Sequence, residues 1–229
     1  MIDRLKLAFM IFVVGVLFTF QPCYADVLYR LDFTEMKDGD AVKWFKKEGF
    51  VFKRDGDEVN LQFNKNRLII ENPKEINGLI TKQVEIKNAK RIRIEWGVSK
   101  YPQGANWEKG ILREAIGFVI TFGDEKISSG SFVVPDVPYF IELFLGELEV
   151  ENKVYTGNYY KKGGRYICTP CKNKVDETIV TDFELKENFS KFFKESVVPP
   201  ITGLTIETDT RDTEGLSKAF IKKIEIFSD

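Results

Sequence analysis

The sequence predicts an all-β protein, a jelly roll or β-sandwich of two antiparallel sheets with one short amphipathic helix. Runs of β-branched and aromatic residues recur roughly every 8–12 residues with turn residues between them, a spacing typical of sandwiches and jelly rolls. Residues 91–96 alternate between charged and apolar side chains, as a strand buried on one face does. Twenty Phe residues supply large side chains for a core.

The first expected strand covers residues 27–33 and places Leu31 and Phe33 on one face. It ends in a turn at residues 37–40. Residues 50–53 and 59–63 form the next two expected strands and flank the turn residues 55–57. Because Asp-Gly is strong hairpin chemistry, these two strands are expected to pair as a hairpin.

The remaining strands are short apolar or alternating runs bounded by polar or turn residues. Ile92, Ile94 and Trp96 are expected to point inward, with the charged residues between them pointing outward. The expected strands are residues 67–70, 79–80, 84–86, 91–96, 116–122, 140–145, 203–209 and 220–227.

One helix is expected at about residues 183–195. Asp182 is the expected N-cap, and residues 197–200 (Val-Val-Pro-Pro) stop the run. Apolar side chains recur at i, i+4, i+7 and i+8, namely Leu185, Phe189, Phe192 and Phe193. We expect this apolar stripe to close one end or face of the sandwich.

The N-terminus predicts export. Arg4 and Lys6 precede an uncharged apolar run at residues 7–20, and Cys23 and Ala25 give a small-x-small ending. Residues 1–25 are therefore expected to be a cleaved signal peptide, with a single β-sandwich domain over 26–229 that is periplasmic or secreted. The alternative is an uncleaved anchor, because residues 7–25 carry no charge and approach the length of a membrane span.

Composition excludes several chemistries. Removing residues 1–25 leaves 32 Lys and Arg against 34 Asp and Glu, which argues against a nucleic-acid partner. The chain contains no His, so Ser-His-Asp and Cys-His catalysis, His-ligated zinc and His-ligated haem are excluded. Acid–base chemistry would fall to carboxylates, Lys, Tyr or Cys.

Three blocks of sequence carry a resemblance that extends from about residue 90 to residue 227. They are residues 94–98 with 101–106, residues 118–122, and residues 200–213 with 218–227. In these blocks the chain resembles an uncharacterised family of exported bacterial proteins, a domain of unknown function. The resemblance implies a secreted β-sandwich similar in outline to carbohydrate-binding jelly rolls, and no established activity. The family's central acidic pair corresponds here to Arg113-Glu114, with one acid.

Cys168 and Cys171 enclose Thr169-Pro170 and would be the two thiols left after signal cleavage. In an oxidising compartment such a pair is expected to form a disulfide, here at a strand end. A redox-active dithiol and a metal site are the alternatives. The surroundings favour a strand running into a basic loop over the helix N-terminus that a low-pKa thiolate needs.

Glu207 and Asp209 are candidate catalytic residues. On a strand they point to the same face about 7 Å apart, within the span of paired glycosidase carboxylates. The spacing also resembles the E-x-D-x-x-E strand of some sandwich glycoside hydrolases, with Asp212 in place of the final Glu. A structural calcium held by Asp209, Asp212 and Glu214, with help from Asp38 and Asp40, is one alternative. An exposed acidic hairpin is another.

Aromatic residues interleaved with polar ones form the candidate ligand-binding set: Trp107, Tyr155, Tyr159, Tyr160 and Arg165. Sugar rings stack their C–H faces on aromatic planes, while Arg and Asn bind hydroxyl groups. The same tyrosines also fit ordinary cross-strand packing.

These observations favour an exported, non-catalytic binding module for a glycan or another envelope ligand. The alternatives are a carboxylate-dependent glycoside hydrolase and a structural or protein-interaction component of the cell envelope. No cofactor is expected, calcium apart, and no membrane insertion is expected after signal cleavage. The sequence does not name a ligand.

Overall fold

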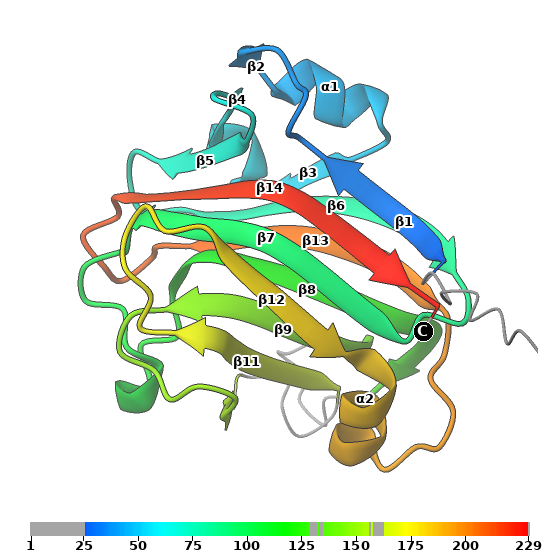
Figure 1. The fold of residues 1–229 in the computed structure, drawn as a ribbon. Coiled ribbons are helices and arrows are strands. Elements are labelled where there is room, and N and C mark those ends of the chain that lie inside the picture. Colours follow the sequence, from blue (N-terminus) through cyan, green and yellow to red (C-terminus); the bar gives the residue numbers. More distant parts are fainter. Residues whose placement is uncertain (1–25, 129–131, 133–134, 156, 158–162, 229) are drawn as a thin grey trace, which may run out of the picture.

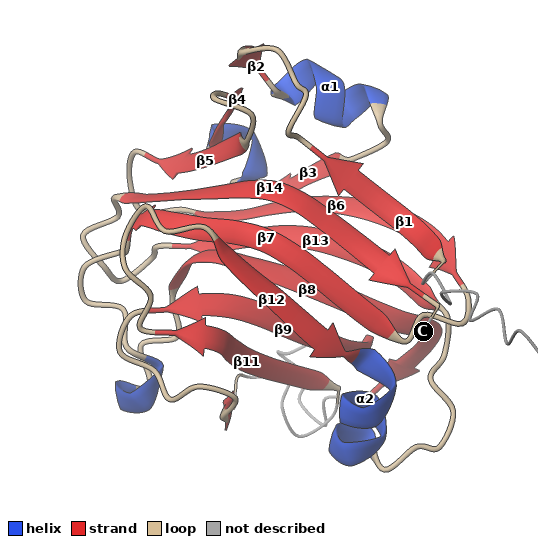
Figure 2. Ribbon diagram, viewed as in Figure 1, coloured by secondary structure: helices blue, strands red, loops and turns tan. Residues whose placement is uncertain are grey.

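Two seven-stranded β-sheets lie face to face in the computed structural model of the protein (Figure 1). The structure describes residues 26–128, 132, 135–155, 157 and 163–228. Within these residues strands make up both layers, and the helical segments lie at the periphery (Figure 2). The predicted β-sandwich is confirmed.

The first sheet has the strand order β12-β7-β14-β5-β4-β2, and β1 pairs with a further stretch of β14. All of its pairs are antiparallel. The strands are β1 (Val27–Asp32), β2 (Gly39–Asp40), β4 (Asn60–Phe63), β5 (Leu68–Asn72), β7 (Arg91–Lys100), β12 (Ile179–Glu184) and β14 (Ser217–Phe227).

The second sheet has the strand order β10-β11-β9-β8-β13-β6-β3. Its pairs are antiparallel except β11 with β9, which run parallel. The strands are β3 (Val51–Arg54), β6 (Asn77–Ile86), β8 (Glu114–Ile127), β9 (Val137–Gly146), β10 (Val154–Tyr155), β11 (Gly164–Cys171) and β13 (Ile201–Asp209).

The core fills the space between the sheets with apolar side chains from their facing sides. On β7 the alternation is as predicted, because Ile92, Ile94 and Trp96 are completely buried. Arg91 and Arg93 point the other way and both bind Asp182 of β12. The period of two thus sets which face of each strand is buried.

The predicted hairpin at residues 50–63 is wrong. β3 pairs with β6 in the second sheet, whereas β4 pairs with β5 in the first. Between them the 3₁₀ turn η1 (Gly56–Glu58) carries the chain from one sheet to the other. Gly56 lies so close to the backbone of Leu79 that a Cβ atom would stand 2.7 Å from its carbonyl oxygen. The Asp55-Gly56 turn thus connects strands of different sheets. Turn chemistry of this kind favours a hairpin, but it does not determine which strand β3 pairs with.

The predicted helix is confirmed as α2 (Leu185–Phe193), which lies at one end of the sandwich (Figure 1). Its Phe189 packs edge-on against Phe122 and Tyr139. The predicted cap is wrong, because Asp182 belongs to β12 and binds two arginines of β7. Glu184 occupies the N-cap without a side-chain hydrogen bond.

A second helix, α1 (Val42–Lys47), was not expected from the sequence. It buries Phe45 against Phe33 and Phe50, with ring centroids 6.0 and 4.8 Å apart. Six residues are too few to show a 3.6-residue period, so the run offered no recognisable helical pattern. A second 3₁₀ turn, η2 (Trp107–Lys109), lies between β7 and β8.

Among the described residues, neither α1 nor α2 is long and apolar enough to cross a membrane. The predicted signal peptide falls on residues 1–25, which lie outside the described residues.

Candidate functional site

The outer face of the second sheet carries a cavity of about 450 Å³. Alternation along the strands builds it: on β13, Leu204 and Ile206 point into the core, while Glu207 and Asp209 line the cavity. Neighbouring strands follow the same rule, so one face of the sheet gathers polar side chains. The charged lining residues are Arg54, Arg113, Glu114, Glu142, Glu207, Asp209 and Arg211.

Two of these carboxyl groups are buried, and each has one oxygen without a hydrogen-bond partner among the described residues. Glu142 of β9 is 1% exposed, and Glu114, at the start of β8, is 4% exposed. No described group forms a hydrogen bond with Oε1 of Glu142 or Oε2 of Glu114. Buried polar atoms in folded proteins are nearly always bonded, so these two oxygens are unusual.

Gly117 of β8 leaves space for the side chain of Glu142. Glu142 is in register with Val119, two residues away along β8, and its side chain leans back over Gly117. A Cβ atom at position 117 would overlap Oε1 of Glu142 and stand 3.1 Å from its Cδ. On the other side of β8, Gly117 is in register with Glu207 of β13. The glycine therefore brings the Glu142 carboxyl toward Glu207.

Burial raises the pKa of Glu142 well above its usual range. The charges of Glu207 and Asp209, both negative, raise this pKa further. Burial also raises the pKa of Glu114, and negative neighbours led by Glu142 add to the effect. Arg113 opposes it at Glu114. Both carboxyls therefore hold a proton more strongly than an exposed Glu does.

The negative charge of Glu207 is better compensated than that of Glu142. Burial raises its pKa and Asp209 raises it further, while Arg54 and Arg211 lower it. Asn77 donates to Oε1 of Glu207 at 3.4 Å, and Asn77 in turn accepts a hydrogen bond from Arg54. The carboxylate predicted from sequence is thus held in place by side chains of β3 and β6.

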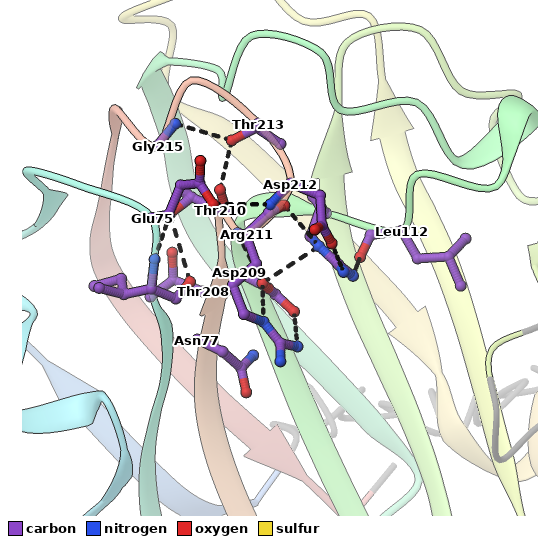
Figure 3. A network of polar contacts seen from close by, with 12 residues as sticks. Glu75, Asn77, Leu112, Thr208, Asp209, Thr210, Arg211, Asp212, Thr213 and Gly215 are labelled. Carbon is purple, nitrogen blue, oxygen red and sulfur yellow. Dashed lines mark hydrogen bonds and ion pairs between the residues drawn. The ribbon is translucent and has the colours of Figure 1, made fainter.

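Asp209 is the anchor of an arginine network (Figure 3). Arg211 donates to both of its oxygens, at 3.0 and 2.7 Å, and Arg113 lies 3.5 Å away. Arg113 also binds the carboxylate of Asp212 and the carbonyl of Arg211, the latter at 2.8 Å. Asp209 therefore acts mainly to fix two guanidinium groups at the rim of the cavity.

The segment after Glu207 is built into the sandwich, so the exposed-hairpin interpretation is wrong for residues 207–210. Thr208 and Thr210 are buried, as is Asp209 at 5% exposure. Thr208 donates to the carbonyl of Ala115 at 2.9 Å, and Thr210 donates to that of Lys74 at 3.0 Å. These bonds hold Glu207 and Asp209 on the cavity face.

The proposed calcium ligands are already engaged in part. Asp209 and Asp212 pair with Arg211 and Arg113, and Glu214 lies on the exposed loop beyond them. In the part of the chain that the structure describes, no three Asp, Glu or Cys side chains group closely enough to hold a metal ion. The calcium site stays a prediction.

Trp107 lies in the cavity wall but is 6% exposed. Its ring stacks on Phe144 with centroids 4.7 Å apart and contacts Tyr166 at 5.2 Å. The indole Nε1 donates to the carbonyl of Arg113 at 3.2 Å. Trp107 is therefore part of a small aromatic core beneath the cavity wall, with an edge that reaches the cavity.

The other aromatic candidates are placed differently. The Tyr155 hydroxyl is hydrogen-bonded to Glu108 at 2.5 Å and Val150 at 2.7 Å, and its ring packs behind Trp107. The guanidinium of Arg165 covers the ring of Phe193 in α2, away from the cavity. Tyr159 and Tyr160 lie outside the described residues. Tyr166 and Phe140 line the cavity in their place.

The Cys168–Cys171 disulfide is confirmed, with sulfur atoms 2.02 Å apart at the end of β11. Both cysteines belong to the small core of Trp107, Phe144 and Tyr155. The disulfide therefore supports the aromatic wall of the cavity from behind.

Sequence reasoning missed Glu142, Gly117 and Arg54 as site residues. Glu142 had a recognisable signal, because it is a single charge inside the apolar run of residues 139–145. Glu114 and Arg113 entered only through the family resemblance, and the structure places both in the cavity.

No protein-family model matches the sequence, and no curated protein matches it either. Several solved structures are similar in fold. A mutant form of the Emp46p carbohydrate recognition domain has 12% identity and a TM-score of 0.44, with 90% of this chain and 98% of that chain covered. The metal-free form of the same domain has 13% identity and a TM-score of 0.41, with 90% of this chain and 96% of that chain covered. A family 29 carbohydrate-binding module from Piromyces equi has 9% identity and a TM-score of 0.34, with 89% of this chain and 90% of that chain covered. At these values the likeness carries no argument about a ligand.

Proposed function

We propose that this chain is an exported, non-catalytic carbohydrate-binding module that holds a glycan in the cavity on the outer face of the second sheet. The cavity carries the proposal: a space of about 450 Å³ in which carboxylates, guanidinium groups and aromatic rings meet. Its volume falls within the roughly 300–1,000 Å³ usual for small-molecule sites. Export rests on the N-terminal pattern of residues 1–25.

The polar lining suits a polyhydroxylated ligand. Each sugar hydroxyl both donates and accepts hydrogen bonds. Glu142 and Glu207 line the cavity with carboxyl oxygens, and Arg113 and Arg211 line it with guanidinium groups whose five N–H donors are only partly used by Asp209, Asp212 and backbone carbonyls. Because the Asp209 network holds both guanidinium groups, little side-chain entropy is lost when they bind.

The apolar lining suits the other property of sugars, their C–H faces. Trp107, Phe140 and Tyr166 line the same cavity as the charged groups. Trp107 is held by Phe144, so its orientation is set before a ligand arrives. A sugar ring that packs against this wall presents its hydroxyl edges to the carboxylates and arginines.

A glycan array on the purified protein, followed by calorimetry on the hits, tests the proposal. We expect at least one oligosaccharide to bind, and Glu207→Gln to weaken it by about tenfold, as loss of a charge-assisted hydrogen bond does. Glu125→Gln is the matched control, because Glu125 is an exposed residue of β8 outside the cavity. Retention of one stoichiometric protein partner with no glycan bound would overturn the proposal.

A carboxylate-dependent glycoside hydrolase is the second candidate, and one observation favours it. Three carboxyls of the cavity, those of Glu114, Glu142 and Glu207, have pKa values raised by burial. A carboxyl that keeps its proton near neutral pH can act as a general acid. New reducing ends after prolonged incubation with a bound glycan, lost in Glu207→Gln but kept in Glu125→Gln, would establish it.

A further inference from the structure

The cavity contains a buried carboxyl, that of Glu142, to which the described residues bring no offsetting positive charge. Glu142 is 1% exposed and lines the cavity, and its Oε1 has no hydrogen-bond partner among the described residues. The charged groups that act most strongly on it, Glu207 and Asp209, are both acidic. A buried carboxylate without a cation or donors is costly, so such a site favours whatever supplies them.

The hydrogen bonds and ion pairs of the arginines that line the cavity go to groups other than Glu142. Arg211 makes two hydrogen bonds to Asp209. Arg113 divides its donors among Asp209, Asp212 and two backbone carbonyls. Arg54 donates to Asn77. These guanidinium groups therefore compensate Asp209 and Glu207 and leave Glu142 without compensation.

Glu114 repeats the pattern at the neighbouring position. It is 4% exposed, it lines the same cavity, and its Oε2 is without a partner among the described residues. It stands in register with Asp209 on β13, next to the Gly117–Glu207 pair. The lining of the cavity thus includes two buried carboxyl groups, on β8 and β9, each with one oxygen that lacks a partner among the described residues.

We propose that the cavity selects a ligand carrying a protonated amine, and that the ammonium group binds to Glu142 above Gly117. This inference rests on the proposed function, and within it the ligand class is a glycan that contains an amino sugar. An ammonium group has three N–H donors and one positive charge. It supplies N–H donors to Oε1 of Glu142. Its positive charge also reduces the repulsion between the carboxylates of Glu142 and Glu207.

A neutral sugar would satisfy only half of this requirement. A hydroxyl group can donate to Glu142, but it leaves the repulsion between Glu142 and Glu207 in place. A proton can also relieve that repulsion, and it is the natural competitor of the amine. Amine binding therefore releases a proton from the carboxyl cluster.

This competition fixes the direction of the pH dependence. The ionisable groups that line the cavity with Glu142 are Glu114, Arg113, Glu207, Asp209, Arg211, Arg54 and Tyr166. Burial raises the pKa values of Glu142, Glu114 and Glu207, so these carboxyls release their protons at higher pH than an exposed Glu does. Amine affinity must rise as pH increases through the raised pKa of the cluster, as long as the amine itself stays protonated.

Calorimetry with four probes tests the proposal. They are a β-1,4-linked glucosamine tetrasaccharide, its fully N-acetylated form, cellotetraose and 1,4-diaminobutane. We expect the free-amine tetrasaccharide to bind at least about tenfold more tightly than the acetylated and neutral ones, a difference of about 1.4 kcal/mol. The affinity of 1,4-diaminobutane, whose alkylamines stay protonated throughout this range, should increase between pH 5 and pH 7.

Glu142→Gln keeps the shape of the side chain and removes its charge. We expect this variant to bind the amine and neutral tetrasaccharides equally, with Glu125→Gln retaining the wild-type preference. Circular dichroism confirms that the variant is folded. Should it not fold, the ranking of the four probes on the wild-type protein and its pH dependence decide the question.

The outcomes separate this inference from the proposed function. Neutral glycans binding as well as the amine tetrasaccharide, or 1,4-diaminobutane affinity falling as pH rises, would overturn the inference and leave glycan binding intact. Binding of 1,4-diaminobutane without any tetrasaccharide would support the amine site and overturn the glycan proposal. No binding of any probe at millimolar concentration would overturn the amine site.

Discussion

Gly117 and Glu142 lie on adjacent strands, and the carboxyl of Glu142 occupies the space that a side chain at position 117 would fill. The arrangement lets a charged group of β9 lean across β8 toward Glu207 of β13. It also buries that group at the floor of a polar cavity. Because Gly117 has no Cβ atom, the buried carboxyl of Glu142 can extend toward Glu207.

Gly117→Ala should therefore displace Glu142 and weaken both folding and ligand binding. The new methyl group overlaps Oε1 of Glu142, and overpacking of this kind costs about 1–3 kcal/mol of unfolding free energy. Urea denaturation measures that cost. A double-mutant cycle supplies the control, because in a Glu142→Ala background the clash partner is gone. If Gly117→Ala costs as much there as in the wild type, the steric relationship does not explain it.

Glu142→Gln should change the pH dependence of stability. Burial raises the pKa of Glu142 in the folded state. As pH increases, Glu142 therefore ionises first in the unfolded chain, near the ordinary Glu pKa of about 4.3, and only at higher pH in the folded protein. The group then destabilises the fold increasingly as pH rises from there to the raised folded-state pKa. Gln cannot ionise, so the variant should melt higher than the wild type at pH 8.

At pH 4 the two proteins should melt nearly together, since Glu142 is mostly protonated in both states. Scanning calorimetry at pH 4 and pH 8 measures the difference, with the exposed Glu125→Gln as the control. A variant that melts below the wild type at pH 8 would contradict the assignment of Glu142 as an uncompensated buried acid.

Loss of the disulfide should loosen the wall of the cavity. Replacing both Cys168 and Cys171 by Ala opens a short loop, which by the chain-entropy relation costs roughly 2 kcal/mol. The pair packs with Trp107 and Phe144, so indole fluorescence should report a more mobile wall. Urea denaturation and acrylamide quenching measure the two effects. Unchanged quenching would show that the aromatic packing alone holds Trp107.

Calcium should leave the melting temperature unchanged. Two of its three predicted ligands, Asp209 and Asp212, already pair with Arg211 and Arg113. Thermal melting with added calcium or with a chelator checks this. A rise in melting temperature with calcium that disappears in Asp212→Asn would instead establish the predicted site.

The sequence predicted the parts of the fold that depend on local pattern. Period-two alternation in residues 91–96 placed Ile92, Ile94 and Trp96 correctly, since which face is buried follows directly from spacing. The hairpin at residues 50–63 failed because strand partners are chosen by packing across the whole sandwich. Gly56 serves a close approach to Leu79 that no local pattern encodes.

The site was predictable only where one strand carries it. Glu207 and Asp209 are two residues apart, so their shared face could be read from the sequence. Glu142 and Gly117 are 25 positions apart in sequence and meet through sheet register, which the sequence alone does not specify. Arg165 shows the same limit, because its partner Phe193 comes from a helix far along the chain.

Trp107 gives a test that separates stability from ligand binding. Trp107→Ala should lower the unfolding free energy by about 3–5 kcal/mol, because the indole fills the small core with Phe144. Loss of binding in that variant would therefore not distinguish a contact from a collapse. Trp107→Phe keeps a stacked ring but removes the hydrogen bond to the Arg113 carbonyl.

We expect Trp107→Phe to fold and to bind glycan several-fold more weakly, since a smaller ring reaches less far into the cavity and Arg113 is held less firmly. Trp44→Phe is the matched control, because Trp44 packs in a separate aromatic cluster with Phe33 and Phe63. Calorimetry on both variants, alongside their melting temperatures, measures the difference. Equal glycan affinity in the two would mean that the wall formed by Trp107 does not contact the ligand, and binding would then depend on the carboxylates and arginines alone.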